Sequence, residues 1–211
     1  MKSIVRMLVL LGMGVIGAAL VFLLWNSDTG YAYRKHWQTE DRLTLDFNRL
    51  QMMSQPQAAA LFPINWFCRS GQSEFGDAFC ADELQRWNDL EALGTVFFYE
   101  SGQLVFVKVD VPPWAHGDLR QALQQNYGAP AGYTSRIQWG KVLLAAAAKV
   151  ASAGVGVPVR LDMAPDELGV WHLPSGAWLV SNMKADWLPW QWSTVFWMSP
   201  KKVVLLNARK S

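Results

Sequence analysis

Ser181 and Lys184 have the spacing at which a serine nucleophile and an activating lysine lie one turn apart on a helix. In enzymes that use this pair for acyl transfer, S-D-N and K-T-G motifs accompany it. Neither motif follows Lys184 in a suitable place, and Ser181 ends a predicted strand. Two fixed positions in four arise readily by chance, so we expect no acyl-transfer site here.

The other residues that could do chemistry are poorly placed for it. The chain has no G-x-S-x-G, H-E-x-x-H or P-loop motif. The acidic pairs Asp82-Glu83 and Asp166-Glu167 are sequence neighbours, and adjacent residues on a helix do not face each other. The three histidines are far apart in the sequence: His36, His116 and His172. We therefore predict no catalytic residue, no metal site and no cofactor.

Cys68 and Cys80 are the only two cysteines. Their spacing is not C-x-x-C, which argues against a thioredoxin-like redox site, and zinc would need further ligands nearby. A structural disulfide that closes a small polar loop is the favoured interpretation, because an export signal precedes it. Two unrelated buried thiols are the alternative.

Tryptophan is concentrated near the end of the chain, where six of the twelve fall between Trp171 and Trp197. The segment 186–192 carries three of them around a proline: Trp187, Trp190 and Trp192. We predict that these three indoles contact a partner protein, the membrane interface or envelope glycans, since tryptophan is a preferred anchor at interfaces. The alternative is a loop that packs on itself over a sheet.

Residues 7–25 contain no charge and no proline. As a helix they would rise about 28 Å, close to the hydrocarbon thickness of a bilayer. Signal-peptide cores are shorter, at about 7–15 residues, and the nearest tolerable cleavage site lies well beyond Trp25. We expect a retained transmembrane anchor that contacts lipid. Basic residues are nearly balanced across it, so the orientation rests on the cysteines, which favour an outside domain.

Composition divides the chain into an anchor at 1–25, a polar juxtamembrane stalk at 26–42 and a periplasmic domain at 43–211. Of the 19 Lys and Arg residues two precede residue 26, and none of the 17 Asp and Glu residues do. The rest of the chain therefore has a formal charge of zero, which gives no electrostatic reason to expect a nucleic-acid partner.

Hydrophobic periodicity predicts helices over 82–93, 117–127 and 138–152, and a helix start at 55–60. A second membrane segment over 142–159 is an alternative for the third helix. Residues 43–47 alternate as a strand would, although a helix through Leu50 also fits. The predicted strands are 95–99, 104–111, 168–173, 177–182, 193–198 and 202–206.

Helices segregated from antiparallel hairpins indicate an α+β fold: an N-terminal transmembrane helix and one extramembrane domain with two or three packed helices. The function we expect is that of a non-enzymatic accessory or assembly subunit of a bacterial inner-membrane complex, single-pass, binding other envelope membrane proteins. The alternatives are a glycan- or lipid-binding module that uses 186–192, and an enzyme whose site forms only in the fold.

Overall fold

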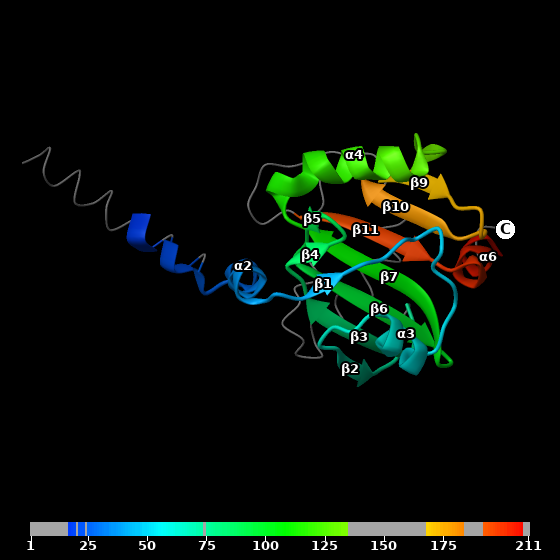
Figure 1. Cartoon of the computed structure of the whole chain (residues 1–211), viewed down its shortest axis with the longest axis horizontal. Helices are drawn as coiled ribbons and strands as arrows, with labels where there is room; N and C mark the ends of the chain where they lie inside the picture. The colour runs from blue at the N-terminus through cyan, green and yellow to red at the C-terminus, as the bar shows by residue number, and fades with distance from the viewer. Residues whose placement is uncertain are drawn as a thin grey trace, which may run out of the picture.

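The computed structural model describes residues 17–19, 21–23, 25–73, 75–134, 168–183 and 192–208. In these ranges a large antiparallel sheet has the strand order β2-β3-β6-β7-β11-β10-β9-β8 (Figure 1). Its strands are β2 (Phe67–Ser70), β3 (Ala78–Glu83), β6 (Gly94–Glu100), β7 (Gln103–Val111), β11 (Ser193–Met198), β10 (Trp178–Asn182), β9 (Leu168–His172) and β8 (Gly132–Thr134). Helices lie beside the sheet, so the α+β prediction is confirmed.

The hairpin of β6 and β7 forms the centre of the sheet, as its β-branched and aromatic runs predict. Its two strands are joined by Ser101 and Gly102, which have φ angles of 52° and 74°. Positive φ at both central residues is the requirement of a two-residue turn whose twist matches that of the strands. The predicted hairpins of 168–182 and the strand over 193–198 are likewise present.

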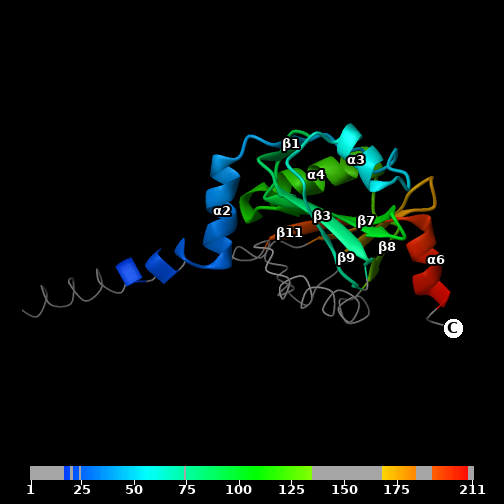
Figure 2. The same ribbon diagram turned by 90° about the horizontal axis from the view of Figure 1, so that it is seen from below.

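Both faces of the sheet are buried. The valines of β7 lie on one face with α3 (Gln55–Leu61) and α4 (His116–Tyr127), which cover the same side of the sheet (Figure 2). Phe106 lies on the other face with Phe98 and Phe196. The predicted helix over 117–127 and the helix start at 55–60 are thus confirmed, and each contributes apolar side chains to the first face: Ala58, Leu119 and Leu123.

The second face of the sheet also contains a buried ion pair. Lys108 Nζ lies 2.6 Å from Asp110 Oδ2, and both side chains are buried. The Thr194 hydroxyl on the neighbouring strand donates to Asp110 Oδ1 at 2.8 Å. A buried ion pair is tolerated when such hydrogen bonds satisfy its remaining oxygens.

The helix predicted over 82–93 is wrong. The chain leaves β3 at Glu83 and forms a second hairpin of β4 (Arg86–Trp87) and β5 (Leu90–Glu91). Asn88 takes the left-handed conformation in the turn, with φ of 52°. Its amide also bonds the backbone of Leu45, with Leu45 N donating to Oδ1 at 3.0 Å and Nδ2 donating to Leu45 O at 3.2 Å. These tertiary bonds and the turn outweigh the helical spacing of the apolar residues.

Residues 43–47 form no helix, and only Leu43 among them belongs to a strand, because a turn begins at Phe47. Leu43, Leu45 and Phe47 are buried, while the residues between them are exposed. β1 (Arg42–Leu43) pairs in parallel with β4, giving a small sheet of order β1-β4-β5. The alternation of apolar and polar residues therefore reflects burial of one side of this segment and does not indicate a long strand.

The strand predicted over 202–206 is also wrong, because α6 (Pro200–Ala208) occupies it. Proline suits the first turn of a helix, and the Ser199 carbonyl accepts from Val203 N at 3.1 Å. Lys202 Nζ donates to Glu100 Oε1 at 2.8 Å and ties this helix to the end of β6. That hydrogen bond holds the pKa of the Glu100 carboxyl below its usual range. The bond at the start of the helix and the ion pair with β6 therefore outweigh the strand preference of the β-branched residues.

The polar segment 26–42 contains a well-formed helix, α2 (Asp28–Gln38). The Ser27 hydroxyl accepts from Gly30 N at 3.2 Å and caps its start. Ala32 and His36, one turn apart, are buried on one side of it. The placement of this segment beside a membrane stays a prediction.

Before α2, residues 17–19, 21–23 and 25 are helical. Among the described residues no helix is long and apolar enough to cross a bilayer. The remainder of the predicted anchor at 7–25 lies outside the described residues, as do the helix predicted at 138–152 and its alternative, a membrane segment at 142–159.

Candidate functional site

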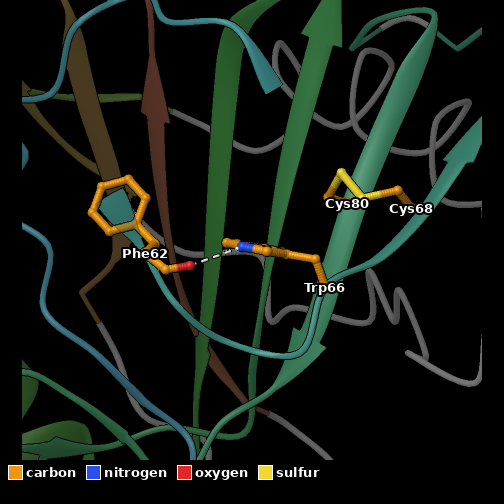
Figure 3. Close-up of a disulfide and its surroundings, with 4 residues drawn as sticks. All are labelled: Phe62, Trp66, Cys68 and Cys80. Carbon is orange, nitrogen blue, oxygen red and sulfur yellow. Dashed lines mark hydrogen bonds between the residues drawn. A yellow bond between two sulfur atoms is a disulfide. The ribbon is translucent and has the colours of Figure 1, made fainter. Parts of the chain in front are cut away.

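The disulfide predicted from the cysteine pair is present. Cys68 on β2 and Cys80 on β3 lie opposite each other, with their Cα atoms 4.0 Å apart (Figure 3). The bond fastens a short, exposed edge strand to the sheet. Just before β2, Trp66 Nε1 donates to the Phe62 carbonyl at 3.0 Å. This region is a structural brace for the edge of the sheet.

Two of the three tryptophans predicted to contact a partner, Trp187 and Trp190, lie outside the described residues. Trp192 is half-buried directly before β11, and its indole Nε1 is buried without a hydrogen-bond partner among the described residues. The proposed role of this segment stays a prediction.

Ser181, the serine of the S-x-x-K spacing, is fully buried in β10. Its hydroxyl has no hydrogen-bond partner within the described part of the chain, and Lys184 lies outside that part. A hydroxyl inside the sheet is closed to a substrate carbonyl.

The fold brings together one serine and one histidine that no sequence motif connects. His116 Nδ1 at the start of α4 lies 2.5 Å from Ser193 Oγ at the start of β11. Both side chains are buried, and burial lowers the pKa of His116. A neutral imidazole beside a hydroxyl is the arrangement of a nucleophile and its base, but here it is enclosed. We interpret the contact as a tie between helix and sheet.

An open cleft of about 560 Å³ lies at the C-terminal end of α2. Its walls come from α2, from the two strands of the β4–β5 hairpin with the residue that precedes them, and from the 3₁₀ helix η1 (Pro113–Ala115). The lining residues are His36, Trp37, Gln85, Arg86, Glu91 and Trp114. The cleft is therefore assembled from three separate stretches of the sequence.

Two exposed indoles give the cleft its apolar surface. Trp37 is 65% exposed and Trp114 is 49% exposed, which is unusual for side chains of this size. Tyr33 lies between them, with ring centroids 6.3 Å from Trp37 and 5.2 Å from Trp114. The Trp114 indole N–H donates to Glu91 Oε2. These contacts hold the rings in position while leaving much of their surface open.

His36 joins α2 to the hairpin at the base of the cleft. Its Nδ1 lies 2.8 Å from the Ala92 carbonyl and 3.1 Å from the Leu84 carbonyl. Because both partners are acceptors, Nδ1 carries a proton and donates. Nε2 faces Glu91, with its carboxylate oxygen 3.9 Å away. The histidine thus fixes one wall of the cleft against another.

The polar part of the cleft contains one charge of each sign. Arg86 and Glu91 are cross-strand partners in the hairpin. Arg86 Nη1 donates to the Asp89 carbonyl at 3.2 Å, which holds the guanidinium on the hairpin. Gln85 adds an amide, and its backbone N–H donates to the Asp41 carbonyl at 2.9 Å.

An acidic cluster lies on the elements beside the cleft. Asp82 on β3 is buried, and its Oδ2 has no hydrogen-bond partner among the described residues. Burial, together with the charges of Asp41 and Glu83, raises the pKa of Asp82 from 3.8 to about 7. Asn65 Nδ2 donates to Asp41 Oδ2 at 2.9 Å. No group of three metal-ligating side chains occurs in the described ranges.

The cleft was not predicted, because its residues belong to the predicted stalk, to the helix predicted over 82–93 and to the stretch between the predicted strand 104–111 and the predicted helix 117–127. The available signal was the pair Trp37 and Trp114, each in a polar or proline-rich setting that offers little core. In comparisons with known proteins, no family model, no curated protein and no solved structure matches this chain, so its function is argued from the cleft itself.

Proposed function

We propose that this protein is a non-enzymatic, membrane-anchored accessory or assembly subunit of a bacterial inner-membrane complex. Its periplasmic domain binds a partner membrane protein in the cleft between α2, the β4–β5 hairpin and η1. The observation that carries the proposal is the combination of two exposed indoles, Trp37 and Trp114, with Arg86 in one concave surface. Tryptophan, tyrosine and arginine are the residues most enriched at the energetic centres of protein interfaces.

Two further features support the location. The uncharged run at 7–25 is long enough to span a bilayer as a helix. The Cys68–Cys80 disulfide is typical of proteins in an oxidising compartment, and this supports a location of the domain outside the cytoplasm.

The proposal is tested by purifying the tagged full chain from native membranes in mild detergent. Wild type should bring down a defined set of membrane proteins at constant ratio. Trp114→Ala and Arg86→Glu should lose them, whereas Phe67→Ala should retain them. Phe67 is the matched control because it is an aromatic of similar exposure, 46%, on β2 rather than at the cleft.

Equal recovery of partners with all three variants would contradict the use of the cleft. If instead no membrane protein accompanies even the wild type, the accessory-subunit function itself fails.

A glycan-binding module that uses the cleft is the second candidate. Two exposed indole faces beside Arg86, Gln85 and Glu91 combine a flat apolar surface with polar groups that can bond hydroxyls. Retention of the protein on isolated cell wall without other proteins, lost in Trp114→Ala, would favour this candidate over a protein partner.

A further inference from the structure

The geometry points to α2 as an interfacial helix: we propose that its outer face lies flat against the phospholipid headgroups of the membrane that holds residues 7–25. This inference rests on the proposed anchor and adds how the domain sits on the bilayer. The occupant of the face is the anionic lipid surface itself.

The chain changes direction sharply between the helical residues that end at Trp25 and α2 (Figures 1 and 2). The helical residues up to Trp25 run crosswise to α2, which begins only three residues later (Figures 1 and 2). A helix that crosses a bilayer near its normal and then turns crosswise must continue along the surface. In both views α2 is the element of the domain nearest to that N-terminal helix.

The corner between the two helices is built by specific contacts. Asn26 donates to the Phe22 carbonyl through both its backbone N–H, at 3.1 Å, and its side-chain Nδ2, at 2.8 Å. The Arg34 guanidinium lies over the Trp25 ring at 4.9 Å and donates to the Trp25 carbonyl. Arg34 thus bridges the end of the first helix and the middle of α2.

The outer face of α2 has a composition that suits a membrane surface. Gly30, Arg34 and Gln38 have the spacing of one helix face, opposite the buried pair of Ala32 and His36. From residue 31 to residue 38 the helix carries Arg34 and Lys35 and no acidic side chain.

Indole rings favour the headgroup layer, and cationic side chains near an anionic membrane surface are attracted to its lipids. Trp25, at the corner between the two helices, is 52% exposed, so its indole is available to the headgroup layer. The face therefore complements a headgroup layer in both charge and polarity.

The experiment uses the full chain with a single nitroxide label, because both native cysteines are held in the disulfide. The label is placed by Gln38→Cys on α2 or, as a matched control, by Gln124→Cys on the exposed side of α4. Each protein is reconstituted into vesicles of phosphatidylethanolamine with a minority of phosphatidylglycerol. Collision rates with oxygen and with a water-soluble nickel complex report the depth of each label.

We expect the label at 38 to collide severalfold less with the nickel complex than the label at 124, and more with oxygen. Arg34→Glu should restore the nickel collisions at 38 without releasing the protein from the vesicles. Equal accessibility at 38 and 124, in protein that floats with the vesicles, would overturn the inference while leaving the anchor intact.

Two other outcomes are distinguishable from these. Protein that fails to float with the vesicles would disprove the anchor at 7–25, and the inference with it. Dipolar broadening between labels at 38 would show that a second copy of the chain, not lipid, covers α2, and would also overturn the inference.

Discussion

Arg86 and Glu91 lie directly opposite each other across the β4–β5 hairpin, so one hairpin supplies both charges of the cleft. His36 and Trp114, from the two elements that flank the hairpin, both approach the same Glu91 carboxylate. Glu91 is therefore the residue at which the three walls of the cleft meet.

Trp114, one of the two exposed tryptophans of the cleft, should contribute little to the stability of the domain. Trp114→Ala removes a half-exposed ring and should change the free energy of unfolding by less than about 1 kcal/mol, the range for surface substitutions. Trp197→Ala, at a fully buried ring of the core, should cost about 3–5 kcal/mol. Urea denaturation of the two variants measures both values. If Trp114→Ala lowered the free energy of unfolding as much as Trp197→Ala, this would show that Trp114 belongs to the core.

His36 should hold α2 on the domain. His36→Ala leaves the Leu84 and Ala92 carbonyls without their donor, and an unsatisfied buried group costs about 1–3 kcal/mol. Hydrogen exchange of the α2 amides should accelerate accordingly while that of β6 and β7 stays slow. Trp37→Ala, at the next residue, is the control and should leave the exchange of α2 unchanged. Unaltered protection of α2 in His36→Ala contradicts the assigned role.

The disulfide should stabilise the domain by restricting the unfolded chain. Its sequence separation is 12 residues, and loops of this size correspond to about 2–3 kcal/mol. Reductant should therefore lower the melting temperature of wild type by several degrees. A Cys68→Ala, Cys80→Ala double variant should melt near the reduced protein and ignore the reductant. Thiol alkylation that labels both cysteines in unreduced, natively located protein would refute the disulfide and the periplasmic placement together.

Asp82 should make stability fall as the pH rises. Its folded pKa of about 7 exceeds its usual 3.8, so the native state binds the proton more tightly. The stability that this group contributes is complete below pH 4 and is lost as the pH approaches and passes 7, by an amount on the order of a few kcal/mol. Asp82→Asn should thus raise the melting temperature at pH 8, with a smaller effect at pH 5. A variant less stable than wild type at pH 8 would show that the ionised carboxylate is needed.

Local patterns predicted most elements of the large sheet, because alternation and turn residues act over short distances. The strands around Ser101-Gly102 and the helix that ends at Gly128 follow from such signals. The segment after β3 was misread because Leu84, Trp87 and Leu90 have helical spacing as well as places in a hairpin. What decides is Asn88, whose amide bonds Leu45, a contact between residues 43 positions apart.

The cleft could not be predicted for the same reason. It depends on α2 docking through His36 onto carbonyls of Leu84 and Ala92, which lie 48 and 56 positions away in the sequence. The predicted interaction segment at 186–192 rested on tryptophan density, and only its last residue belongs to the described chain. Composition can indicate that a surface is rich in indoles, but it does not reveal which indoles meet across a fold.

Site-specific photo-cross-linking in intact cells tests directly whether the cleft binds a partner membrane protein. A photoreactive phenylalanine analogue replaces Trp114 in the cleft, and Phe67 on β2 in the control, with the full chain expressed at its native level. We expect a discrete cross-linked membrane protein at position 114 that is absent at position 67 and is lost when Arg86→Glu is added. Cross-linking that is equal at both positions, or absent at 114 in folded and membrane-located protein, would contradict binding in the cleft.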